Sequence, residues 1–318
     1  MSKFAQLRKA KSADISKLTE IVQRGRFIDN LKLAQIPRPS SQTLANFEAS
    51  TMTGDNLKSV IKSGMLTFLL HCEARIASNI GMGYYTIGPC GEELLAATTL
   101  HLRPTDACAL HYRHVSNAVL RQLLTHKSVE DIALDRARGF TCSTLDPITG
   151  GKHCSIGGGP FDYLVTSTLA SQAPPAVGRA LGIALSNHLL GDGKAPYSRD
   201  AISYVSLGDG SVNNAHFLAA LNLSKYAAHR RMKCPVVFVI SDNKKCISLK
   251  GHGWIDEFVK NSGMKHEIAD GTDVVDVFNK SREVMTYSRK MSKPSILLCS
   301  KLPRRFGYAA TDRQSAYM

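Results

Sequence analysis

Two uninterrupted apolar runs in the middle of the chain predict buried strands. The first covers residues 201–207 and ends at a Gly-Asp-Gly turn, and the second covers residues 235–241 and ends at an Asp-Asn pair. Residues 214–228, between the runs, have the apolar spacing of a helix. The apolar positions expected near one face of this helix are Phe217, Leu218, Leu221 and Leu223. The pattern therefore predicts a strand–helix–strand unit.

The polar residues that follow these two strands predict a site for a metal and a phosphate. Asp209 follows the first strand and Asn243 the second. Consecutive parallel strands direct their carboxyl ends to one edge of a sheet, so both side chains are expected there, beside a helix N-terminus. Carboxylate and carbonyl oxygens suit a hard divalent cation, and a helix N-terminus suits a phosphate. A second Gly-Asp-Gly, at residues 191–193, has no long apolar run before it and is interpreted as a loop.

The rest of the chain alternates between helical and strand patterns. Helices are expected over residues 55–80, 92–102, 174–190 and about 273–289, and strands over 107–110 and 295–300. This alternation predicts an α/β fold with a doubly wound, mainly parallel sheet and helices on both faces. Residues 1–54 are polar and interrupted by prolines, so we expect an extended N-terminal arm before a domain covering residues 55–318.

Composition favours a globular protein without a membrane anchor. Of the 318 residues, 43% are hydrophobic and 21% charged, which is ordinary for a folded domain. No apolar run is long enough to span a bilayer, and the N-terminus lacks an apolar signal region. An intracellular location is therefore expected: the mitochondrial matrix in a eukaryote, or the cytoplasm in a bacterium. A weak presequence-like pattern comes from Arg8, Lys9, Lys11 and Lys17.

The positive charge and the cysteines exclude few classes of function. A formal charge of +14 suits nucleic acid, anionic lipid or an acidic protein. No nucleic-acid-binding motif accompanies the charge, so the basic clusters are interpreted first as solvated surface, next as a contact for an acidic partner or an anionic substrate, and only third as a nucleic-acid site. The eight cysteines show no CxxC spacing, which predicts mainly buried, reduced thiols rather than a zinc or redox motif.

Several ordered segments resemble the alpha subunit of thiamine-diphosphate-dependent 2-oxo acid dehydrogenases, the decarboxylating component of these multienzyme complexes. The resemblance extends from about residue 55 to the C-terminus. It is closest to the branched-chain enzymes, with pyruvate and acetoin enzymes as near alternatives. The segments that carry it, besides the Gly-Asp-Gly unit, are Tyr84-Tyr85-Thr86-Ile87-Gly88, Gly91-Glu92-Glu93, His111-Tyr112-Arg113, residues 165–174, Arg305-Phe306-Gly307 and residues 311–317.

The resemblance implies roles for individual residues. Asp209, the side-chain carbonyl of Asn243 and the main-chain carbonyl of Lys245 would hold Mg²⁺. Tyr112 and Arg113 would hold the diphosphate, the arginine through charge-assisted hydrogen bonds. The remaining cofactor contacts implied are Ser167 and Leu169 at the aminopyrimidine ring, and Gly208, Gly210 and Ser211 at the phosphates.

The resemblance also implies the reaction and the partners. Thiamine diphosphate acts as an electron sink while CO₂ leaves a small 2-oxo acid. The activating glutamate comes from a beta subunit or a fused beta half, in a heterotetramer. The acyl group then passes to a lipoylated acyltransferase core. Neither nucleic acid nor membrane is expected as a partner.

Departures from the family pattern favour an alternative function. Tyr308 stands where the family has a histidine that assists acyl transfer, and a phenol cannot replace imidazole as an acid/base near neutral pH. Asp242 replaces the usual first asparagine of the pair. The chain stops at Met318, which suggests truncation of the domain. The alternative is a catalytically silent paralogue that scaffolds or regulates an active complex.

Overall fold

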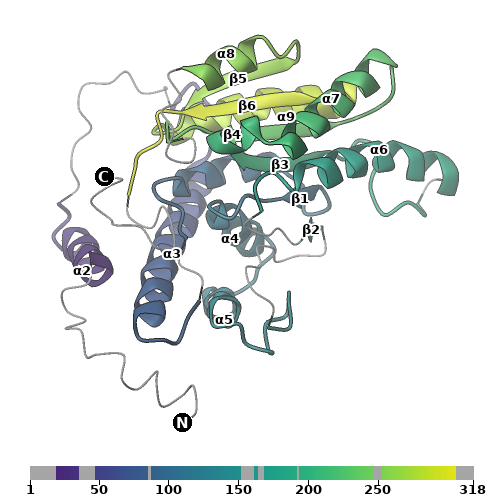
Figure 1. Ribbon diagram of the computed structural model, residues 1–318. Helices are drawn as coiled ribbons and strands as arrows, with labels where there is room; N and C mark the ends of the chain where they lie inside the picture. Colours follow the sequence, from purple (N-terminus) through teal and green to yellow (C-terminus); the bar gives the residue numbers. More distant parts are fainter. Residues whose placement is uncertain are drawn as a thin grey trace.

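The protein is built on one parallel sheet, whose strands run across the view in Figure 1 and lie one below another from β5 to β2. The computed structural model describes residues 19–35, 47–84, 87–151, 161–163, 168–191, 193–245 and 253–305. All six strands are parallel and lie in the order β2-β1-β3-β4-β6-β5. In chain order they are β1 (Ala107–Ala109), β2 (Asp162–Tyr163), β3 (Ser203–Gly208), β4 (Val236–Ser241), β5 (Lys265–Asp270) and β6 (Ser295–Ser300). The predicted doubly wound α/β fold is confirmed.

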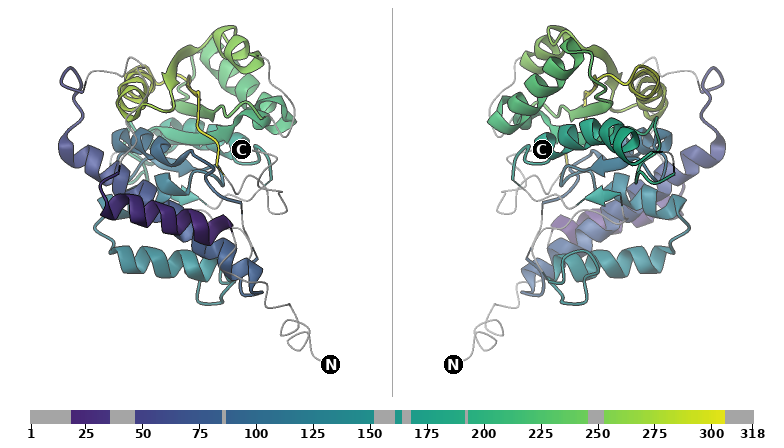
Figure 2. Two further views of the ribbon diagram at one scale, coloured as in Figure 1. Left: turned by 90° about the vertical axis from the view of Figure 1, so that its left-hand side faces the viewer. Right: turned by 90° about the vertical axis from the view of Figure 1, so that its right-hand side faces the viewer.

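Helices cover both faces of this sheet (Figures 1 and 2). The first face is covered by α6 (Ala173–Leu190), α7 (Ala215–His229) and α8 (Trp254–Lys260). The second is covered by the 3₁₀ helix η2 (Glu93–His101), α4 (Val115–Leu124) and α9 (Val274–Met291). Two further helices, α3 (Gly54–Asn79) and α5 (Val129–Phe140), pack outside η2 and α4.

The central strand β4 shows why the sheet is buried on both sides. Val236, Phe238 and Ile240 pack into the core beneath α6, α7 and α8. Val237 and Val239 point the other way, into the core with η2, α4 and α9. Because side chains alternate along a strand, a strand covered on both faces must be apolar throughout. This explains the continuous apolar run in the sequence.

The structure corrects two expectations. Part of the N-terminal region predicted to be an extended arm is a helix, α2 (Thr19–Lys32), which packs on α3. Glu20 of α2 is buried and ion-paired with Arg75 of α3. The local pattern of polar residues could not reveal this contact, because the two partners are far apart in the sequence. In α7, Leu218 and Leu223 are exposed rather than part of the apolar face. The buried stripe consists of Phe217, Ala220, Leu221, Ser224 and Ala227.

Two further findings concern the expectations from composition. Among the described cysteines, six are free thiols and five of these are buried; Cys154 and Cys246 lie outside the described residues. Within the described part of the chain, no helix has the length and apolar character needed to cross a bilayer.

Candidate functional site

Side-chain oxygens of Asp209 and Asn243 converge on one backbone N–H. The N–H of Lys245 lies 3.1 Å from Oδ2 of Asp209 and 3.0 Å from Oδ1 of Asn243. The N–H of Gly210 donates to the other oxygen of Asp209 at 2.8 Å. Asp209 is 5% exposed and Asn243 6%. The structure therefore brings together the two oxygen-bearing side chains that the sequence predicted to meet after the two strands.

The parallel register of β3 and β4 explains this meeting. Gly208, the last residue of β3, is paired with Ser241, the last residue of β4. Asp209 follows Gly208 directly and begins the 3₁₀ helix η3 (Asp209–Asn213). Both polar segments therefore leave the sheet at the same height and at the same edge, which is where ligands bind in open parallel sheets.

The residues at this edge fit a magnesium-bound phosphate. A carboxylate and an amide carbonyl are oxygen ligands of the type that Mg²⁺ prefers. Ser211 is fully buried, and its hydroxyl has no hydrogen-bond partner within the described residues. Buried polar atoms are normally paired, so this hydroxyl is suited to a polar ligand. A Cβ on Gly208 would lie 3.4 Å from the His111 ring, so the backbone is closely packed here.

Lys245 is at the site through its backbone, as expected, but by a different group. The resemblance implies its carbonyl as a metal ligand, whereas the structure shows its N–H donating to Asp209 and Asn243. The carbonyl role stays a prediction. The described residues stop at Lys245 and resume at Gly253.

Tyr112 and Arg113 lie in the turn that follows β1. The N–H of His111 donates to the hydroxyl of Ser206 on β3 at 2.8 Å, which ties this turn to the strand that carries the Asp209 segment. The Arg113 guanidinium donates to the carbonyl of Gly88 at 3.2 Å and lies 5.2 Å from the centre of the Tyr112 ring. Burial raises the pKa of the Tyr112 phenol, although the Arg113 charge opposes this. Both predicted diphosphate ligands are therefore positioned by the sheet edge.

Of the remaining predicted residues, the structure describes only Leu169. Leu169 is half-buried, just before α6. Near it, the amide of Gln172 donates to the carbonyl of Ser206 at 2.9 Å, which joins the start of α6 to β3. Ser167 and Tyr308 lie outside the described residues, so their roles stay predictions.

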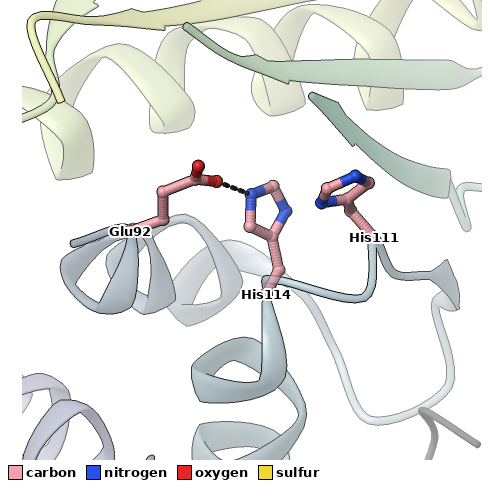
Figure 3. A group of neighbouring side chains, drawn as sticks. All are labelled: Glu92, His111 and His114. Carbon is pink, nitrogen blue, oxygen red and sulfur yellow. Dashed lines mark hydrogen bonds and ion pairs between the residues drawn. The ribbon is translucent and has the colours of Figure 1, made fainter. Parts of the chain in front are cut away.

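A buried Glu–His pair lies beside Asn243, and sequence reasoning assigned it no role. Nε2 of His114 lies 2.8 Å from Oε2 of Glu92 and 3.2 Å from the hydroxyl of Ser241. The side-chain N–H of Asn243 donates to the other oxygen, Oε1 of Glu92, at 3.2 Å. Figure 3 shows His114 between Glu92 and His111, with Glu92 coming from the start of η2. Glu92 thus links the helix layer to the predicted metal ligand.

The charge state of this cluster follows from its surroundings. Burial by itself raises the pKa of Glu92, but the His114 hydrogen bond, together with the His114 and Arg113 charges, brings the pKa below its usual value. Burial is also the main reason why the pKa of His111 lies well below its usual value. Glu92 is therefore ionised near neutral pH, whereas His111 is uncharged.

Glu92, His111 and His114 also have the side chains of a metal site, with ligand atoms within 4.8 Å of one another. The hydrogen bonds argue for another use. Both oxygens of Glu92 are already occupied, one by His114 and one by Asn243. We therefore interpret the cluster as a hydrogen-bonded support for Asn243.

The segment after β6 closes the site from a third direction. Nε of Arg304 donates to the main-chain carbonyl of Asn243 at 3.0 Å. The Arg305 side chain is ion-paired with Glu93. The backbone N–H of Arg305 donates to the main-chain carbonyl of Cys90 at 3.0 Å. This segment therefore connects the turn before η2 with the segment after β4.

The sequence contained a signal for the Glu92 support. Gly91-Glu92-Glu93 was one of the segments that carried the family resemblance, although acids at the start of a helix are ordinarily exposed and give no sign of burial. Identifying the partner as Asn243, 151 residues away, required the tertiary structure. Arg304 carried no comparable signal, since it lies in a basic run that is usually solvated.

Comparison with known proteins identifies the family of this chain and agrees with its fold. A sequence model described as "Dehydrogenase E1 component" matches residues 64–318. The alpha subunit of acetoin:2,6-dichlorophenolindophenol oxidoreductase from Cupriavidus necator is 33% identical over 113 residues. That alignment covers 34% of this chain and 32% of the relative.

Solved structures show the same fold at low sequence identity. A transketolase variant from Pichia stipitis matches with a TM-score of 0.54 and 18% identity, over 81% of this chain and 37% of that one. The transketolase from Leishmania mexicana gives 0.53 and 15%, over 82% and 38% respectively. The chain thus spans well under half of these structures. The extent of the family match confirms the resemblance to the alpha-type subunit: this chain belongs to the dehydrogenase E1 component family.

Proposed function

We propose that this chain is the alpha part of an enzyme that oxidatively decarboxylates a 2-oxo acid with thiamine diphosphate and Mg²⁺. The observation that carries the proposal is the convergence of Asp209 and Asn243 oxygens at the ends of adjacent parallel strands. Family membership supports the reaction class. When bound, thiamine diphosphate would supply the electron sink that lets CO₂ leave the substrate.

The chain's own residues would bind and orient the cofactor. Asp209 and Asn243 would hold Mg²⁺, with the Lys245 carbonyl as a further ligand. Arg113 has five N–H donors, so it can bind a diphosphate oxygen while still donating to Gly88. Gly208 and Gly210 would allow close approach of the backbone to the phosphates. Tyr112, Ser167, Leu169 and Ser211 complete the proposed cofactor contacts.

The proposed partners follow from what an alpha part lacks. A beta subunit or fused beta half would contribute the glutamate that activates the cofactor. The acyl group would pass to a lipoyl group on an acyltransferase core. Isolated alpha chain is therefore expected to be inactive without a beta partner.

Branched-chain 2-oxo acids are the proposed substrates, followed by pyruvate. Acetoin is the alternative, because the relative from Cupriavidus necator is named for acetoin oxidation. The test is a measurement with the purified alpha–beta complex and an artificial electron acceptor, with and without thiamine diphosphate and Mg²⁺. It follows CO₂ release from the oxo acids and acetaldehyde formation from acetoin. Cofactor-dependent CO₂ release supports the proposal, whereas turnover of acetoin alone would contradict the 2-oxo acid assignment.

A second function, that of a catalytically silent paralogue, is favoured by one observation. Tyr308 stands where the family has a histidine. An assembled complex that binds thiamine diphosphate and Mg²⁺ but releases no CO₂ from any of these acids would support this alternative.

A further inference from the structure

We propose that Glu92 is a positioning residue that fixes the Asn243 side chain so that its carbonyl oxygen, rather than its NH₂ group, faces the cation. The inference rests on the proposed function, because the cation is the one that Asp209 and Asn243 would hold. It assigns a purpose to a buried acid that makes no direct contact with the proposed ligand set except through Asn243.

The orientation of the Asn243 amide follows from its two neighbours. On one side, the backbone N–H of Lys245 lies 3.0 Å from the amide and can only donate. On the other side, the Glu92 carboxylate lies 3.2 Å away and, when ionised, can only accept. A flipped amide would place NH₂ against the N–H and oxygen against the carboxylate. Only one orientation satisfies both contacts, and it points the oxygen to the Asp209 side.

Glu92 is itself held firmly enough to impose this orientation. Its second oxygen accepts a hydrogen bond from Nε2 of His114, and both side chains are almost completely buried, at 1% and 0% exposure. The Ser241 hydroxyl, 3.2 Å from the same nitrogen, donates to the carbonyl of Leu207 on β3. The backbone is fixed as well, because a Cβ on Gly91 would lie 2.3 Å from the carbonyl oxygen of Pro303.

Groups that orient a metal ligand typically contribute 10-fold to 100-fold to metal affinity. The measurement is calorimetric titration of Mg²⁺ into the alpha–beta complex at saturating thiamine diphosphate. Glu92→Met, similar in size but unable to accept, should weaken Mg²⁺ binding by about 10-fold to 100-fold. Glu92→Gln should lose much less, because its amide oxygen can still accept from Asn243.

Glu92→Met combined with Asn243→Asp distinguishes a loss of amide orientation from a general disruption of the site. An aspartate presents an oxygen in either orientation, so Glu92→Met should not weaken Mg²⁺ binding in the Asn243→Asp background. The matched control is Glu20→Met, another buried glutamate paired with a basic residue but on α2. This control should lower the melting temperature and leave Mg²⁺ affinity unchanged.

The outcomes separate this inference from the proposed function. Equal weakening by Glu92→Met in both backgrounds, or no weakening in the native one, would overturn the positioning role while the proposed function stands. Absence of Mg²⁺ binding by the native complex would overturn both. A loss confined to the native background establishes the role of Glu92.

Discussion

The backbone N–H of Lys245 lies 3.1 Å from Oδ2 of Asp209, although 36 residues separate them in the sequence. One strand–helix–strand crossover brings them together, because β3 and β4 end in register. The same N–H also lies 3.0 Å from Asn243. This point, where a carboxylate and an amide oxygen meet, is the proposed cation site.

Replacing Asp209 should therefore strongly weaken Mg²⁺ binding. Asp209→Asn keeps the size of the side chain but removes the charge that Mg²⁺ requires, so we expect Mg²⁺ affinity at saturating thiamine diphosphate to fall by at least about 100-fold, more than the loss of a supporting residue. Calorimetric titration measures this change. The control is Asp55→Asn, at an exposed position in the first turn of α3. A variant that binds Mg²⁺ like the native protein would show that Asp209 is not a ligand.

Arg113 should be required as an arginine rather than only as a positive charge. Lysine cannot reproduce the planar fork of donors, so Arg113→Lys should raise the dissociation constant for thiamine diphosphate by about 10-fold to 100-fold. Fluorescence titration with the cofactor tests this. The control is Arg230→Lys, since Arg230 lies at the exposed end of α7. A fall in melting temperature with unchanged cofactor affinity would mean that Arg113 stabilises the fold and does not bind the cofactor.

Gly91 should be intolerant of any side chain. Its φ is +106°, and a Cβ would lie 2.3 Å from the carbonyl oxygen of Pro303. Gly91→Ala should therefore lower the free energy of unfolding by about 2–4 kcal/mol. Gly178→Ala is the matched control, because nothing lies within 4 Å of a Cβ there, inside α6. Chemical denaturation should show an unchanged or slightly increased stability for the control, and equal effects of the two changes would refute the steric argument.

Stability should fall in mild acid. Burial, assisted by the charges of Arg75, Arg305 and Arg113, lowers the pKa of His71 to about 3, and burial likewise lowers that of His101 to about 4. In the unfolded chain both would titrate near 6.5. Below that value the unfolded state binds more protons, so the free energy of unfolding should decrease by up to about 1.4 kcal/mol per pH unit for each histidine.

Denaturation between pH 8 and pH 5 measures this dependence. It should be flat above pH 7 and decline below 6.5. His71→Gln should reduce the slope in the acidic range, whereas an unchanged slope would show that His71 is not buried uncharged in solution.

Tyr308 provides a test based on sequence alone. If the family histidine assists acyl transfer, Tyr308→His should raise overall flux through an assembled complex, since imidazole titrates near neutral pH and phenol does not. The artificial-acceptor assay, which bypasses the lipoyl group, should change little. Equal flux in both forms would contradict the idea.

The pattern of the sequence was sufficient for four of the six strands, β1, β3, β4 and β6, and for the meeting of Asp209 and Asn243 at one edge of the sheet. Strands buried on both faces leave uninterrupted apolar runs, and the polar residues after them must lie at the carboxyl edge. The pattern could not show the partners that reach this edge from elsewhere. Glu92 contacts Asn243 from the start of η2, and Arg304 contacts it from the segment after β6. Contacts between residues so far apart in the sequence produce no local pattern.

The helix α2 was missed for a related reason. Its segment is polar, so local composition predicted an extended arm. A buried ion pair between Glu20 and Arg75 connects the segment to α3, and an ion pair of this kind does not produce an apolar stripe.

The most direct test of the site is the position of a bound cation. Crystals of the alpha–beta complex grown with thiamine diphosphate and Mn²⁺ in place of Mg²⁺ would show manganese by its anomalous scattering. We predict one peak between Oδ of Asp209 and Oδ1 of Asn243, with the NH₂ of Asn243 still donating to Glu92. A peak between His111 and His114, or coordination that leaves Asp209 out, would contradict the account.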